Sequence, residues 1–182
     1  MQRLPIQLND LSLATLPEVT IPSDYLNIPH IIQCPQLLLF CEPGLNNEQF
    51  LRLQATHMAF NSENITDVGI NEFLMRWARG NGIRGFQEAH LWHKGYANST
   101  MFEGLVFSEW DEEFKMQEWL FVADFESVWG NTIRYQVQSI IDPYESLTFV
   151  IKPGCIAIYH TGRRVDTRDG DSFTRYKFNS MN

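Results

Sequence analysis

The fold is decided by the segment Leu53–Leu91, LQATHMAFNSENITDVGINEFLMRWARGNGIRGFQEAHL. Within it, Ile70, Phe73, Leu74 and Trp77 follow the spacing i, i+3, i+4 and i+7, which places them on one face of an α-helix. The flanking residues have the short apolar pattern of β-strands. Because a helix with one apolar stripe must pack against another element, the sequence predicts a strand–helix–strand unit here.

The predicted helix has typical signals at both of its ends. Asn64 and Thr66 precede it, and their side-chain oxygens are suited to accept hydrogen bonds from the first free backbone N–H groups. Asp67 favours the positive end of the helix dipole and Arg79 the negative end. Gly80 is then expected to stop the helix.

A strand pattern with the spacing i, i+3, i+5 occurs four times. The four sets are Leu8, Leu11 and Leu13; Cys34, Leu37 and Leu39; Leu53, Thr56 and Met58; and Phe86, Ala89 and Leu91. This spacing is typical of a leucine-rich repeat, in which a strand sends two apolar side chains inward and the chain returns through a helix. Because the sets start at the unevenly spaced residues 8, 34, 53 and 86, the sequence predicts an irregular stack of such units.

The C-terminal third has a different pattern, with apolar residues at period two. It covers 133–137, 147–151 and 156–160, and a last hairpin is predicted at Asp169-Gly170. The predicted fold class is therefore α/β: an irregular leucine-rich-repeat-like stack of strand–helix units that ends in antiparallel strands. We expect a single domain of residues 1–182.

The segment that joins the two halves is harder to interpret. Helical spacing predicts a helix over 101–110. The acidic run 111–113 interrupts the apolar pattern and is interpreted as a solvated turn. The apolar segment 119–129 fits a helix and a strand equally well.

The composition argues against several classes of partner. The net charge is -8 and the pI is near 5.0, whereas nucleic-acid binding requires clustered Lys and Arg, so we expect no nucleic-acid partner. No run of about 20 apolar residues is present, so we expect no membrane association. Cys34, Cys41 and Cys155 lack paired spacing, and no signal-peptide pattern precedes them. This predicts reduced thiols in a cytoplasmic or nuclear protein.

Three patterns with chemical associations have simpler interpretations. The GxGxxG match at residues 80–85 follows a helix and precedes a strand, which reverses the order of a dinucleotide site. His90 and His93 are three apart on a predicted strand, so their side chains point to opposite faces. Cys155 and His160 lack a known nucleophile motif. We therefore expect no catalytic, cofactor-binding or metal-binding residues.

Three motifs in order resemble a known family. They are Ile65-Thr66 with Ile70-Asn71, Phe73-Leu74, Trp77 and Gly80; Phe102-Glu103-Gly104-Leu105; and Asp166-Thr167-Arg168-Asp169-Gly170. Together they resemble the F-box-associated domain, type 2, of nematode proteins, which usually follows an N-terminal F-box. The chain departs from that pattern at Gly69, where the family has an acidic residue. Arg3-Leu4-Pro5 is similar to the start of an F-box, but no complete F-box pattern follows.

The resemblance implies a non-enzymatic module that recognises a protein target. In a full-length F-box protein, such a module selects the substrate of a cullin-type ubiquitin ligase. Binding of an Skp-type adaptor is implied only if an F-box lies upstream. The alternatives are a small cytosolic enzyme with a dispersed active site, or a fragment without its own activity.

A recognition site is predicted at Trp92, His93, Lys94 and Tyr96. These aromatic and cationic side chains follow a predicted strand and are types that often anchor protein interfaces. The alternative for Trp92 is a place in the core.

Overall fold

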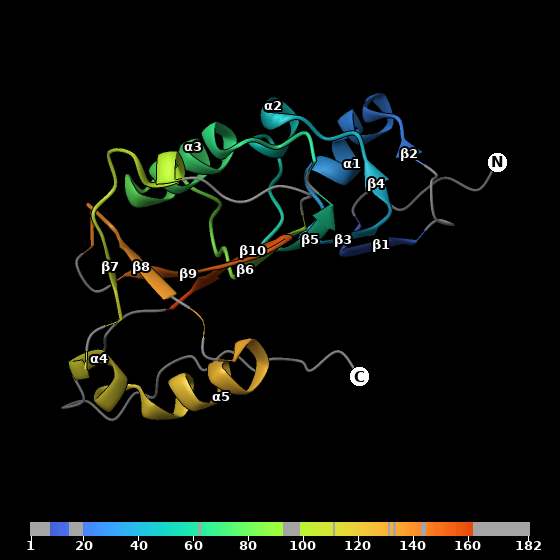
Figure 1. The fold of residues 1–182 in the computed structure, drawn as a ribbon. Helices are drawn as coiled ribbons and strands as arrows, with labels where there is room; N and C mark the ends of the chain where they lie inside the picture. The colour runs from blue at the N-terminus through green and yellow to red at the C-terminus, as the bar shows by residue number, and fades with distance from the viewer. Residues whose placement is uncertain are drawn as a thin grey trace.

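A computed structural model describes residues 8–14, 20–61, 63–92, 99–110, 112–130, 132, 134–142 and 145–161. In these parts of the chain, eight strands form one mixed sheet in the order β1-β3-β5-β6-β10-β9-β8-β7. Helices lie on both faces of this sheet (Figure 1). The predicted α/β class is confirmed at this level.

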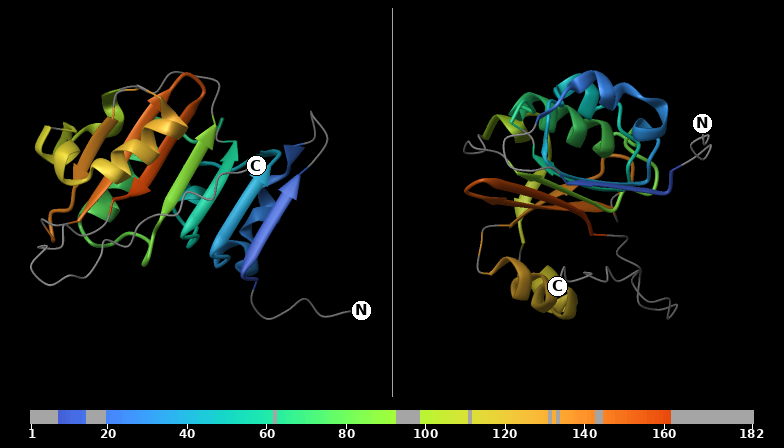
Figure 2. Two further views of the ribbon diagram at one scale, coloured as in Figure 1. Left: turned by 90° about the horizontal axis from the view of Figure 1, so that it is seen from below. Right: turned by 90° about the vertical axis from the view of Figure 1, so that its right-hand side faces the viewer.

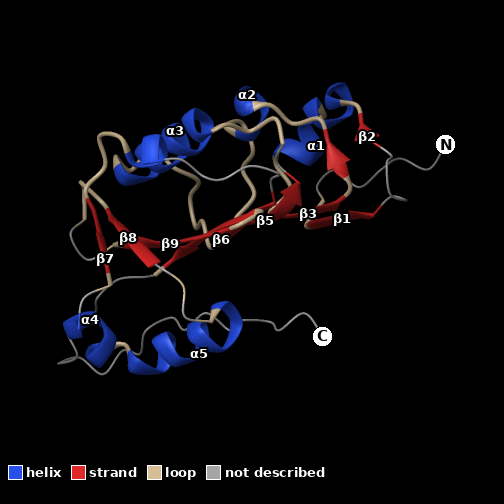
Figure 3. Cartoon of the chain, viewed as in Figure 1, coloured by secondary structure: helices blue, strands red, loops and turns tan. Residues whose placement is uncertain are grey.

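One half of the sheet is parallel. Its neighbouring strands are β1 (Asp10–Ala14), β3 (Gln36–Phe40), β5 (His57–Asn61) and β6 (Glu88–Trp92). The connections contain β2 (Thr20–Ile21), η1 (Ser23–Asn27) and α1 (Pro29–Ile32), then β4 (Glu42–Pro43) and α2 (Asn47–Phe50), then α3 (Asp67–Ala78). The three α-helices cover one face of the sheet (Figures 1 and 3), as expected when successive crossovers of one hand move across a sheet in one direction.

The other half of the sheet is antiparallel, as the period-two pattern predicts. It consists of β7 (Phe107–Glu109), β8 (Arg134–Gln138), β9 (Ser146–Lys152) and β10 (Cys155–His160), and β10 joins it to β6. Before β7 lies η2 (Ser99–Phe102), and after it α4 (Glu112–Gln117) and α5 (Trp119–Trp129). Figure 1 shows α4 and α5 on the face opposite α3. The predicted hairpin at Asp169-Gly170 lies outside the described residues.

The strand register corrects the third apolar set. One row of paired residues is Leu11, Leu37, Met58 and Ala89, and the next is Leu13, Leu39, Phe60 and Leu91. The set equivalent to the others is therefore Ala55, Met58 and Phe60, and the predicted set that begins at Leu53 is wrong by two residues. Leu53 follows α2 and is itself buried, which explains why an apolar residue occurs there although it is not the first position of the strand pattern. Thr56 precedes the strand and donates a hydrogen bond to the Pro35 carbonyl (3.1 Å).

The helix predicted after Thr66 is confirmed as α3, but its first turn is held differently from the prediction. Thr66 makes no side-chain capping bond. Instead, Asn47 of α2 accepts a hydrogen bond from the Thr66 N–H (2.9 Å) and donates one to Thr66 Oγ1 (2.8 Å). The predicted stop is confirmed, because Gly80 follows the helix with φ +75°. Asn47 thus holds the two helices together.

Two apolar cores lie on opposite faces of the sheet. The larger core packs α1, α2 and α3 on the sheet and contains Phe50, Phe73 and Phe86, whose rings form a continuous contact with centroids 5.2 Å apart at each step. The smaller core lies under α4 and α5 and includes Phe125 and Tyr159. Because each core fills one face, strands β8 to β10 are covered on both sides.

The helix predicted over 101–110 is wrong. The helical turn η2 ends at Phe102, Gly104 follows with φ +73°, and Phe107–Glu109 form β7. A residue with positive φ stops a helix, which separates two apolar stretches that the spacing alone joins. The acidic pair Glu112–Glu113 is not a turn but opens α4, where negative charge suits the helix dipole.

Candidate functional site

On the sheet face opposite α1 to α3, the described helices cover only one end. α4 and α5 lie over β8, β9 and β10, whereas no described helix lies over β1, β3 and β5 on that side (Figure 2). Along each strand, alternate side chains point to this face because the side-chain period is two. The surface that they form combines polar and aromatic groups.

Three of these side chains gather where β3 and β6 end. The Phe40 ring lies 6.4 Å from the Trp92 ring and the His90 ring 6.3 Å from it, measured between centroids. Phe40 is 44% exposed, and Trp92 and His90 are half-buried. We call Phe40, His90 and Trp92 the aromatic patch. β5 lies between their two strands, so the patch is formed by residues far apart in sequence.

A hydrogen-bonded network fixes one side of the aromatic patch. The Trp129 indole N–H of α5 donates to the Tyr159 hydroxyl (2.9 Å), and that hydroxyl lies 2.9 Å from His90 Nε2. Glu88 Oε2 lies 3.6 Å from the same nitrogen. The His90 ring therefore has a defined orientation, which ties β6 to β10 and α5.

The pKa shifts of this network favour fixed protonation states. Burial raises the pKa of Tyr159, as does the nearby Glu88 carboxylate, so the phenol stays neutral. For Glu88, burial favours the neutral acid, but the hydrogen bond from His90 and the charges of His90 and His57 outweigh it and lower the pKa. The network therefore suits positioning and binding.

Of the predicted recognition residues, only Trp92 is described. It lies at the end of β6, on the opposite face from Leu91, which is buried in the larger core. Trp92 is half-buried and belongs to neither core. His93, Lys94 and Tyr96 lie outside the described residues.

Of the patterns with chemical associations, the GxGxxG match and the pair Cys155 and His160 lie among the described residues, whereas His93 lies outside them. Gly80 and Gly85 have positive φ in the turn between α3 and β6. Cys155 and His160 are five apart on β10, so they point to opposite faces. Burial raises the pKa of Cys155 to about 11, which keeps it a thiol. In the described part of the chain, no cluster of three His, Cys, Asp or Glu side chains is placed to hold a metal ion.

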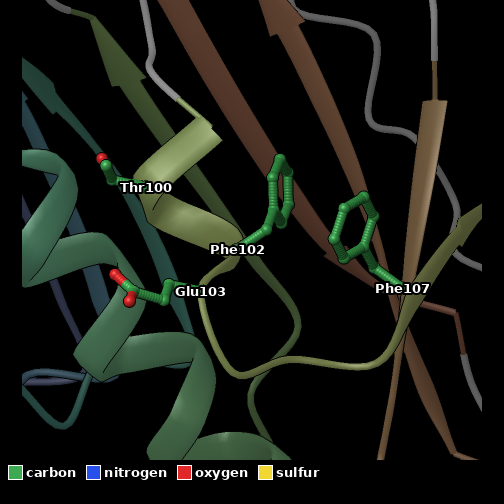
Figure 4. Close-up of a pocket in the computed structure, with 4 residues that line it drawn as sticks. All are labelled: Thr100, Phe102, Glu103 and Phe107. Carbon is green, nitrogen blue, oxygen red and sulfur yellow. The ribbon is translucent and has the colours of Figure 1, made fainter.

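A second candidate site lies at the other end of the sheet. Thr100, Phe102, Glu103 and Phe107 line an open pocket of about 350 Å³ between η2 and β7 (Figure 4). The Phe102 and Phe107 rings stack with centroids 4.6 Å apart. We call this the edge pocket. Sequence reasoning missed it because the two rings belong to a strand and a turn that were predicted to form one helix.

Comparison with known proteins gives one relative. In an alignment that covers 97% of this chain, the sequence is 38% identical to an uncharacterized F-box protein of Caenorhabditis elegans. The chain is therefore similar to this nematode F-box protein over nearly all of its own length. It spans about half of the length of that relative, 47%.

The two other comparisons gave no match. No family model matches the chain, so only the three sequence motifs support the resemblance to the F-box-associated domain, type 2. No solved structure matches it. Among the described residues of this chain, there is no helix with the length and apolar character needed to cross a membrane.

Proposed function

We propose that the chain is a non-enzymatic recognition module that binds a protein target through the aromatic patch. The observation that carries the proposal is the pair of rings of Phe40 and Trp92, which lie 6.4 Å apart on the sheet face opposite α1 to α3. Aromatic side chains supply large contact areas at low entropic cost and are enriched among interface hot spots. Because the strands beneath are hydrogen-bonded on both sides, the rings sit on a rigid support.

The surroundings of the patch add polar contacts. His90 is oriented by Tyr159, and Glu88 lies on the same face at the edge of the patch. An apolar centre with a polar rim is the usual anatomy of a protein interface. His93, Lys94 and Tyr96 follow Trp92 directly in sequence, and we propose that they extend this surface.

Within a longer protein, we propose that this module selects the target of a cullin-type ubiquitin ligase. The relationship to a nematode F-box protein and the type 2 motifs support this role. Contact with the ligase would pass through an Skp-type adaptor bound to an F-box upstream. The three unpaired cysteines support a reducing compartment, the cytoplasm or nucleus.

We also propose that the parallel half is an irregular leucine-rich-repeat-like stack. Its support is the order of four successive parallel strands, each connected to the next on the same face. In repeat proteins of this kind, the face without helices forms an extended binding surface. The aromatic patch lies on the equivalent face.

The test is affinity recovery from a cytosolic extract. The chain is compared with a form extended upstream, where the gene encodes one, and both are scored for an Skp-type adaptor and a cullin. We expect only the extended form to recover the adaptor. If neither form recovers it, the ligase role is wrong.

Target binding is tested with a double variant. Proteins recovered by the wild-type chain should be lost with Phe40→Ala/Trp92→Ala. They should be kept with Tyr25→Ala, which removes an exposed aromatic side chain in η1 on the other side of the sheet. Equal recovery by all three proteins, each shown to be folded by circular dichroism, would refute the role of the patch.

A further inference from the structure

β7 is the last strand of the sheet in the described part of the chain, and its outer edge is not paired there. The Gln138 N–H donates to the Val106 carbonyl (3.2 Å), and Ser108 pairs with Gln136. In an antiparallel ladder, residues that bond to the neighbouring strand alternate with residues that do not. The N–H and C=O groups of Phe107 and Glu109 therefore point away from β8, toward the open edge.

The edge pocket lies beside these outward backbone groups. The Phe107 ring points to the same side of the sheet as Phe102 and Tyr135, with centroids 4.6 Å and 5.7 Å away (Figure 4). Phe107 is 43% exposed and the preceding Val106 is 63% exposed. A strand added at this edge would place alternate side chains on the pocket side.

The sequence that forms this edge is acidic. Residues 99–113 include Glu103, Glu109, Asp111, Glu112 and Glu113 and no Lys or Arg. Glu103 lines the edge pocket, and Glu109 is exposed two residues after Phe107, on the same side of the strand. Of the described cations that follow β7 in sequence, Lys115 pairs with Glu112 (2.7 Å) and Arg134 with Glu126 (3.2 Å), so neither pairs with Glu103 or Glu109.

We propose that the β7 edge binds an extended basic segment of a protein target as an additional strand. An apolar side chain of that segment enters the edge pocket opposite Phe107, and a Lys or Arg two residues away lies opposite Glu109. Backbone hydrogen bonds to Phe107 supply affinity, and the alternation of apolar and basic side chains supplies specificity. A second copy of this chain is a poor occupant, because its net charge is -8.

This inference deepens the proposed function, because it adds a chemical class of target and a second contact. The edge pocket and the aromatic patch lie on opposite faces, and β10, β9 and β8 separate β7 from β6 in the sheet. Each site is therefore tested alone. One target that used both would bind more tightly than through either site.

The test measures fluorescence anisotropy of a labelled peptide, GTLTRTLTRTG, with the purified full chain. We expect saturable binding that weakens as salt is raised. The charge-reversal variant Glu103→Lys/Glu109→Lys should lower the affinity at least about tenfold. Asp24→Lys/Glu48→Lys makes the same change in net charge at exposed sites near η1 and α2, and should leave the affinity within about twofold.

Two further controls separate the possible outcomes. The same peptide with N-methylated Leu and Arg residues, which cannot donate the strand hydrogen bonds, should not bind. The variant Phe40→Ala/Trp92→Ala should bind the unmodified peptide as the wild type does. No binding by the wild-type chain, or binding that Glu103→Lys/Glu109→Lys leaves unchanged, would overturn the edge site and leave the role of the aromatic patch to its own test.

Discussion

The Tyr159 hydroxyl lies 2.9 Å from His90 Nε2 and accepts a hydrogen bond from the Trp129 indole N–H at 2.9 Å. One buried oxygen therefore connects strands β10 and β6 with helix α5. Tyr159 is only 1% exposed, and loss of its hydroxyl would leave both partners without this hydrogen-bonding oxygen. The aromatic patch thus depends on the packing of the face that α5 covers.

Tyr159→Phe tests this connection. The variant keeps the ring in the smaller core but leaves the Trp129 N–H and His90 Nε2 without this partner. We expect the free energy of unfolding to fall by about 1–3 kcal/mol, measured by urea denaturation. Tyr25→Phe, at an exposed position in η1, should cause no change. Equal urea midpoints for Tyr159→Phe and the wild type would contradict the structural role of the hydroxyl.

Glu88 should make stability depend on pH in the acidic range. Burial raises the pKa of Glu88. The hydrogen bond from His90 and the charges of His90 and His57 together lower it by a larger amount, so its folded-state pKa lies below the ordinary value of 4.5. The resulting stabilisation is present above the unfolded pKa and is lost as pH falls through the folded pKa. Glu88→Gln should therefore lose stability near pH 6 and differ less from the wild type near pH 3.

Urea unfolding of the wild type and Glu88→Gln across this range measures the effect. Glu48→Gln, at an exposed position in α2, serves as the matched control. A difference between Glu88→Gln and the wild type that stays constant from pH 6 to pH 3 would show that the charge of Glu88 has no part in it.

Position 69 requires glycine because Asn47 packs closely against it, and not because the backbone there has a positive φ. A Cβ at this position would lie 2.3 Å from Asn47 Oδ1 and 2.6 Å from its Cγ. Gly69→Ala must therefore displace Asn47 from its two hydrogen bonds with Thr66. We expect a net loss of about 1 kcal/mol, because the lost bonds outweigh the better helix propensity of Ala.

A double-mutant cycle decides the cause. In an Asn47→Gly background the close Asn47 atoms, at 2.3, 2.6 and 3.1 Å, are all gone, so Gly69→Ala should stabilise the protein by up to about 1 kcal/mol. Thermal or urea unfolding of the four proteins shows whether Gly69→Ala raises or lowers the free energy of unfolding in each background. If Gly69→Ala has the same effect in both backgrounds, Asn47 is not the reason for glycine at this position.

Cys155 should react slowly with alkylating reagents. Burial raises the pKa of its thiol to about 11, and nearby Lys152 lowers it only partly. Only the thiolate is nucleophilic, so at pH 8 the reactive fraction is on the order of 100-fold below that of a free cysteine. Iodoacetamide labelling followed by peptide mass spectrometry should show slow modification in the folded chain and fast modification in urea. Fast labelling of the folded chain would instead support the alternative that the chain is an enzyme.

Prediction from the sequence succeeded where the signal was local. The four apolar residues of α3 lie within two turns of helix, and the period-two strands lie within a few residues of each other. It failed over 101–110, where apolar spacing continued across Gly104 although the backbone there has φ +73°. It also placed the third apolar set two residues too early, at Leu53. Leu53 is an apolar residue that follows a helix, and the spacing pattern alone does not distinguish it from an apolar residue that precedes a strand.

The candidate sites were less accessible to sequence reasoning. Trp92 was predicted from its residue type and its place after a strand, but Phe40, its neighbour in the aromatic patch, had no signal because it belongs to a strand two positions away in the sheet. The edge pocket joins Phe102 and Phe107 across a turn that was predicted as helix. In both cases the contact depends on how elements meet.

By itself, the sequence determined the helix α3, the strands on either side of it, the antiparallel end and the acidic charge, because periodicity and composition act over a few neighbouring residues. Only the tertiary structure decided which sheet face α4 and α5 cover, that Phe40 and Trp92 meet on one face, and which strand forms the edge of the described sheet at Phe107. These choices depend on strand pairing and burial between residues far apart in the chain, where the free energy of packing and not local propensity determines the arrangement.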